Sequence, residues 1–96
     1  MFEWDEAKNQ SNIAKHGVSF AFARKIFTGV VLTHTDGRND YGELREVSIG
    51  LAEGVAILAV AHTDRRGITR IISARPATRK ERKRYGEALR KGIIGC

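Results

Sequence analysis

Cysteine, proline and long apolar runs are all scarce in this 96-residue chain. The single cysteine is the last residue, so no internal disulfide can form. The longest apolar run is the seven residues 55–61, whereas a membrane-spanning helix needs about 20. The first residues, MFEWDEAK, are acidic where a secretory signal would be basic. We therefore expect one folded domain over residues 1–96, stabilised by packing, in a reducing cytoplasm.

Acidic residues are scarce in the last third of the chain. Residues 65–96 contain eleven Lys and Arg against two Asp and Glu, a net charge of +9. Residues 1–64 contain six against nine, a net charge of −3. The basic residues are interspersed with Ile and Ala at the spacing of a strand followed by a helix, so a loose tail is not expected. A basic face on a folded element favours a polyanion as partner, and first of all nucleic acid.

Apolar spacing and turn residues predict an α+β fold. Asp5 fits an N-cap and Gly17 a left-handed helix end, which together bound a first helix. Thr78 and Glu81 form a capping box, T-x-x-E, at the start of the last helix. The expected elements are a short strand or anchoring arm at 2–4, helices at 6–16 and 20–27, a meander of four strands at 30–35, 45–51, 55–62 and 68–75, and a helix at 79–91.

Two arginines lie in the strand predicted at residues 68–75. Because side chains alternate along a strand, Arg70 and Arg75 are expected on opposite faces unless a bulge before Pro76 changes the register. A structural interpretation pairs Arg70 with Glu46 or Glu53. A functional interpretation makes it a phosphate clamp, for which the planar guanidinium is well suited.

The last helix is predicted to pack on the sheet through Tyr85, Ala88 and Leu89. If it runs back along the sheet, Glu81 should lie nearer Arg75 and Tyr85 nearer Arg70. Its other basic side chains form either a nucleic-acid-facing rim or an ordinary solvated face. These are Arg79, Lys80, Lys83, Arg84, Arg90 and Lys91, with Arg82 at the border of the buried stripe.

The first helix carries a polar stripe of Lys8, Asn12 and Lys15, for which a solvated face is the simplest interpretation. His16 stands at the end of this helix, either as a capping residue or as a proton donor or phosphate contact. The other two histidines are isolated, and we predict no metal site.

Because no Ser–His–Asp pattern, Gly-rich phosphate loop or CxxC motif is present, an enzyme of this sequence would depend on arginine charge and one proton-transfer group. Cleavage of RNA through its 2′-hydroxyl fits that inventory and needs neither metal nor cofactor.

Several segments resemble the BrnT family, the toxins of bacterial type II toxin–antitoxin pairs. They are FEWDEAK, KHGVSF, GELR, and RIISAR followed by ATRKERKRY, and together they run from residue 2 to about residue 85. The resemblance implies a RelE-like ribonuclease fold with two N-terminal helices, an antiparallel sheet and a C-terminal helix. It implies metal-independent RNA cleavage that inhibits translation. It also implies a cognate antitoxin with a ribbon-helix-helix DNA-binding part, so that DNA is contacted only through the complex.

The resemblance also identifies candidate site residues. Arg65, Arg70 and Arg75 would supply charge to a phosphate, and Glu81 is the candidate base. Tyr85 would stack on a nucleobase or orient the substrate. The expected RNA-binding residues are Lys15, His16, Arg45, Arg79, Arg82, Lys83 and Tyr85.

Two other interpretations fit parts of the sequence. The first is a non-catalytic nucleic-acid binder, because helix, Gly17 turn and helix resemble a helix-turn-helix. Against it, the second helix is FAFARKIF, which is mostly apolar and offers only Arg24 and Lys25 to read bases. The second is an assembly protein whose basic face docks an acidic partner, and an antitoxin could cover that same face.

Overall fold

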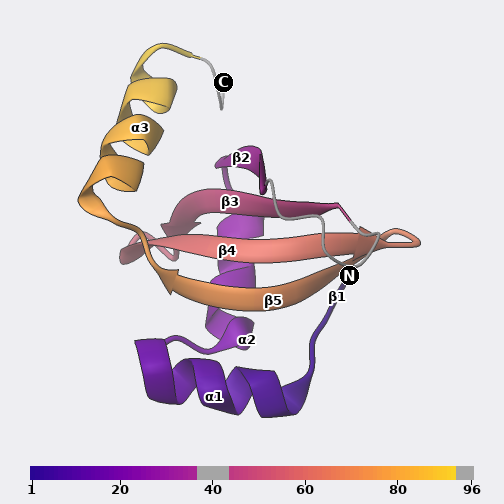
Figure 1. The fold of residues 1–96 in the computed structure, drawn as a ribbon. Helices are drawn as coiled ribbons and strands as arrows, with labels where there is room; N and C mark the ends of the chain where they lie inside the picture. The colour runs from indigo at the N-terminus through magenta and orange to yellow at the C-terminus, as the bar shows by residue number, and fades with distance from the viewer. Residues whose placement is uncertain (37–43, 93–96) are drawn as a thin grey trace.

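The structure, a computed structural model, describes residues 1–36 and 44–92 of the chain. Within these ranges a five-stranded sheet is combined with three α-helices and one 3-10 helix, which confirms the predicted α+β class (Figure 1). No helix in these ranges has the length and hydropathy needed to cross a membrane. The elements are β1 (Phe2–Glu3), α1 (Glu6–His16), α2 (Phe20–Ala23), η1 (Arg24–Thr28), β2 (Val31–Asp36), β3 (Arg45–Ala52), β4 (Ala56–Arg65), β5 (Ile68–Pro76) and α3 (Arg79–Arg90).

The sheet has the strand order β1-β5-β4-β3-β2. Strands β2 to β5 form the predicted antiparallel meander. Strand β1 pairs parallel with β5, with Phe2 opposite Thr69 and Glu3 opposite Arg70. The sheet is therefore mixed, and the prediction of a wholly antiparallel sheet is corrected at β1. Local sequence does not reveal this partner, because the pairing joins Glu3 to a residue 67 positions along the chain.

Local capping signals set the helix ends where the sequence predicts them. The Asp5 carboxylate accepts hydrogen bonds from the N–H groups of Ala7 and Lys8 at the start of α1. Gly17 ends α1 with φ of 70°, a conformation that glycine adopts without strain. Ser19 caps α2, but the predicted second helix is divided into a four-residue α-helix and the 3-10 helix η1.

The helices pack on the two faces of the sheet, which we call the α2 face and the α3 face. On the α2 face, Phe20, Ala23 and Ile26 are fully buried against the strands. A helix buried in this way cannot serve as the recognition helix of a helix-turn-helix. The strand residues Leu58, Val60, Ile71 and Ala74 lie on the α2 face, whereas Ile49 and Ala59 lie on the α3 face with Ala77 and Tyr85. Strand β4 is thus buried on both faces, as predicted.

Helix α3 crosses the sheet instead of running back along β5 (Figure 1). It rises from the end of β5 and contacts β2 and β3. Tyr85 and Ala88 are buried as predicted, but Leu89 remains 42% exposed because the crossing helix presents only one narrow stripe to the strands. Leu51, near the far end of β3, is 43% exposed.

Asn12 closes the outer edge of β5 and is only 7% exposed. Its side-chain amide donates to the carbonyls of Val18 and Ala74, at 2.8 Å each, and its oxygen accepts the Ala74 N–H at 3.2 Å. Strand β1 pairs only with Thr69 and Arg70, so Asn12 takes the place of a strand partner farther along. A solvated face is therefore the wrong interpretation for Asn12, although Lys8 and Lys15 on the same stripe are exposed.

Candidate functional site

A bulge in β5 brings its two arginines to the same face of the sheet. Ser73 lies opposite Ala61 and Ile71 opposite His62, so Ile72 has no partner on β4. Arg70 is opposite Thr63 and Arg75 opposite Ala59, four residues apart on the regular strand β4. Both arginines therefore lie on the α3 face. Opposite faces were expected unless a bulge changed the register, and the bulge at Ile72 does so.

The same face carries two further arginines. Arg45 in β3 lies on the other side of Thr63 from Arg70, in one cross-strand row. Arg65 is two residues beyond Thr63 on β4 and shares its face. With strands about 4.8 Å apart, the Cα atoms of Arg45 and Arg70 are about 10 Å apart, and the Arg75 row is about 13 Å away along β4. We call Arg45, Arg65, Arg70 and Arg75 the arginine face.

Arg70 is paired with Glu3 rather than with Glu46 or Glu53. Its guanidinium donates to the Glu3 carboxylate at 3.2 Å, and its side chain stays 29% exposed. Glu46 lies opposite His62, on the α2 face, and Glu53 is bonded to Lys25. The parallel pairing of β1 with β5 therefore decides which carboxylate meets Arg70.

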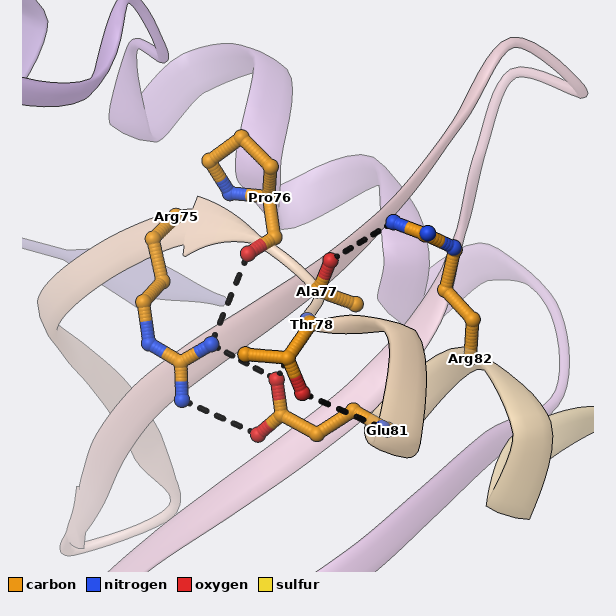
Figure 2. A network of polar contacts seen from close by, with 6 residues as sticks. All are labelled: Arg75, Pro76, Ala77, Thr78, Glu81 and Arg82. Carbon is orange, nitrogen blue, oxygen red and sulfur yellow. Dashed lines mark hydrogen bonds and ion pairs between the residues drawn. The ribbon is translucent and has the colours of Figure 1, made fainter.

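Arg75 and Glu81 form a two-pronged ion pair at the corner between β5 and α3 (Figure 2). The two guanidinium nitrogens donate to the two carboxylate oxygens at 2.6 and 2.9 Å. One Glu81 oxygen also accepts the Thr78 N–H at 2.9 Å, and the Thr78 hydroxyl accepts the Glu81 N–H at 3.1 Å, which confirms the predicted capping box. Arg82 donates to the Ala77 carbonyl at 3.0 Å. These contacts fix the corner and, with it, the direction of the Arg75 side chain.

The charges of this pair reinforce each other. Hydrogen bonds from the Arg75 guanidinium, with a smaller contribution from the Thr78 N–H, lower the pKa of Glu81 to about 2, although burial opposes the shift. The same hydrogen bonds raise the pKa of Arg75. Glu81 is therefore ionised at neutral pH and is a weak base there, because a general base works best with a pKa near the working pH. The geometry favours a role for Glu81 in holding Arg75.

Tyr85 lies in the core beneath α3, not beside Arg70. It is 5% exposed, and its hydroxyl donates to the Val30 carbonyl at 2.7 Å. Val30 precedes β2, at the opposite edge of the sheet from β5. The predicted proximity to Arg70 is therefore wrong, because α3 crosses the sheet. Burial of the ring disfavours stacking on a nucleobase in this conformation, and the orienting role stays a prediction.

The remaining predicted RNA contacts lie outside the arginine face. Arg79, Arg82 and Lys83 are exposed on α3. Lys15 and His16, at the end of α1, line a hollow with Ile72 and Ser73 of β5. Sequence reasoning did not single out Glu3, whose meeting with Arg70 depends on the pairing of residues 67 apart.

The surroundings of His62 show what holds its ring. His62 shares a hydrogen bond of 2.7 Å with the Ser48 hydroxyl and packs edge-on against Phe27. Burial lowers the pKa of His62, which favours the neutral ring. Over residues 1–36 and 44–92, no three His, Cys, Asp or Glu side chains come together in an arrangement that could hold a metal ion.

Comparison with known proteins identifies the family of this chain. Residues 4–81 match the family model described as "Ribonuclease toxin, BrnT, of type II toxin-antitoxin system". The crystal structure of the Brucella abortus ribonuclease toxin BrnT is similar, with 31% sequence identity and a TM-score of 0.65 over 82% of this chain and 99% of that one. No curated protein matches the chain significantly. The chain therefore belongs to the BrnT family, the ribonuclease toxins of type II toxin–antitoxin systems.

Proposed function

We propose that this ribonuclease toxin cleaves RNA on the arginine face, without a metal ion, and thereby inhibits translation. The observation that carries the proposal is the position of Arg45, Arg65, Arg70 and Arg75 on one face of three adjacent strands. Within the described residues, α3 is the helix that packs on this face, where it lies against β2 and β3 and meets β5 at the Arg75–Glu81 pair. RNA approaching the β5 side would meet guanidinium groups first.

The proposed chemistry is attack by a ribose 2′-oxygen on the adjacent phosphorus. The bond from phosphorus to the 5′-oxygen breaks, which leaves a 2′,3′-cyclic phosphate and a 5′-hydroxyl. The 2′-hydroxyl loses its proton to solvent, and the leaving oxygen gains one from solvent. Negative charge builds up on the phosphate in the transition state, and preorganised guanidinium groups stabilise charge of that kind. Fixed positive charge supplies most of the rate enhancement in this proposal.

Within this scheme, Arg70 and Arg75 contact the phosphate that is cut, with Arg45 and Arg65 beside them. Glu81 keeps the Arg75 guanidinium in one orientation through two hydrogen bonds. An oriented guanidinium loses less conformational freedom when it binds a phosphate than a freely rotating one would. We therefore reassign Glu81 from candidate base to positioning residue. The exposed cations Arg79, Arg82 and Lys83 of α3 would bind the flanking RNA backbone.

The toxin is further proposed to act in the cytoplasm as a single RelE-like domain spanning residues 1–96. Its partner would be a cognate antitoxin with a ribbon-helix-helix part, and DNA would be bound only through the complex. Membership of a type II toxin–antitoxin family supports a protein antitoxin. Co-purification of the two proteins, followed by a promoter-fragment shift that needs both, tests this part of the proposal.

Expression of wild type beside Arg70→Gln tests the cleavage site. We expect wild type to arrest growth and, once purified, to cleave RNA in EDTA. Loss of one stabilising charge should reduce the cleavage rate by about 100-fold or more. Arg24→Ala is the matched control, because Arg24 is exposed on η1, away from the arginine face. The proposal is contradicted if folded Arg70→Gln cleaves RNA like wild type. It is also contradicted if wild type needs a metal ion for cleavage.

A further inference from the structure

The outer edge of β5 is only partly covered beside the bulge at Ile72. Strand β1 pairs only with Thr69 and Arg70, and the Asn12 amide takes the backbone of Ala74. Between these two partners, the edge of β5 at Ile72 and Ser73 lies against α1. A hollow of about 190 Å³ opens there.

The hollow is lined by cations and hydroxyl groups. Lys8 and Lys15 stand two helical turns apart on α1, which separates their Cα atoms by about 10 Å. His16 adds a third nitrogen group, and Ser11 and Ser73 add hydroxyls. Lys8, Lys15, Ser11 and Ser73 are exposed. No Asp or Glu is among the residues that line the hollow, all of which belong to the described part of the chain.

The Asn12 amide forms the floor of the hollow but is fully used by the backbone of Val18 and Ala74. A ligand must therefore be held by the side chains around it. The C-terminal end of α1 is the negative pole of the helix, so an anion would bind through Lys8 and Lys15 rather than through the helix dipole. Lysine ammonium groups, hydroxyls and a histidine ring are all donors that suit phosphate oxygens.

We propose that this hollow binds a phosphate of the RNA backbone next to the one that is cut. The inference rests on the proposed RNA cleavage at the arginine face and extends its binding site. Residues 72 and 73 lie between Arg70 and Arg75 along β5, so the hollow adjoins the arginine face. An RNA strand that crosses β5 from the arginine face would reach α1 with its next phosphates. The KHG segment, with Lys15 and His16, would then contact substrate from outside the sheet.

The test compares the double variant Lys8→Ala/Lys15→Ala with wild type and with Arg24→Ala/Lys25→Ala. The control removes the same charge from η1, which packs on the α2 face, away from both the hollow and the arginine face. The probe is a labelled single-stranded oligonucleotide with 2′-O-methyl groups, which cannot be cleaved through the 2′-oxygen. Its affinity is measured by fluorescence anisotropy over a range of salt concentrations, after circular dichroism has shown that each variant is folded.

Loss of the phosphate held in the hollow should make the slope of log K against log salt shallower by about 0.7 in the lysine variant. The control should keep the wild-type slope. An unchanged slope in the lysine variant would overturn the inference. If that variant also escapes neutralisation by the antitoxin while it binds RNA like wild type, the hollow is an antitoxin site instead. Cleavage of unmodified RNA by wild type is scored separately. If wild type does not cleave, the proposed function fails, whatever the slopes show.

Discussion

At the scale of single residues, the Glu81 carboxylate has two tasks. It caps α3 through the Thr78 N–H, and it binds Arg75 through both oxygens. Glutamine can cap a helix in the same way but cannot carry the charge. The variant Glu81→Gln therefore removes the ion pair and leaves the cap in place.

The difference in stability between wild type and Glu81→Gln should depend on pH. The pKa of Glu81 is lowered to about 2 in the folded protein, so the pair stabilises wild type above the unfolded pKa of about 4.3, and this contribution is lost as pH falls towards 2. We expect the variant to be less stable at pH 7 by about 1–2 kcal/mol, a figure reduced for the exposure of Arg75. The two proteins should converge near pH 2. Urea unfolding at both pH values measures this, and an equal difference at both would contradict the assignment.

Tyr85 offers a second residue-scale prediction. Removing its hydroxyl in Tyr85→Phe leaves the partly buried Val30 carbonyl without this donor. We expect a loss of about 1 kcal/mol in the free energy of unfolding, with the RNA cleavage rate unchanged. Denaturant titration and a cleavage assay on the same sample give both quantities. An exposed tyrosine would show no such loss of stability, because its hydroxyl would be bonded to water.

At the scale of elements, Asn12 joins α1 to the edge of β5. In Asn12→Ala, the buried N–H and carbonyl of Ala74 lose their partners, and so does the carbonyl of Val18. We expect this to cost about 3 kcal/mol, and amide exchange at Ala74 should become faster. Gln10→Ala is the control, because Gln10 is exposed and bonds only to Glu6 in the described structure. Equal effects of the two substitutions would show that the edge needs no such partner.

The elements also show which parts of the fold local sequence specifies. Asp5, Gly17 and the Thr78–Glu81 box set helix ends through contacts within a few residues, and all three were predicted. The bulge at Ile72 carries no glycine or other local signal and depends on how β5 meets β4. The pairing of Glu3 with Arg70 and the crossing of α3 likewise depend on distant parts of the chain. The residues of the candidate site could therefore be named from the sequence, whereas their common face could not.

At the scale of the whole molecule, the net charge of +6 should govern how RNA binds. If each side chain of the arginine face contacts one phosphate, RNA binding involves four phosphate contacts. Because each contact on a single strand contributes about −0.7, we expect a slope of about −3 or steeper for log K against log salt. Titration of the 2′-O-methyl oligonucleotide between low and physiological salt measures this slope. A slope near zero would mean that RNA is held mainly by uncharged contacts.

The pairing of Glu3 with Arg70 joins the beginning of the chain to a strand near its end, 67 residues later. During translation, the residues of β1 and of both N-terminal helices are synthesised long before β5 leaves the ribosomal exit tunnel. Contacts between such distant segments form late in folding. The arginine face is therefore completed only after β5 has emerged from the ribosome.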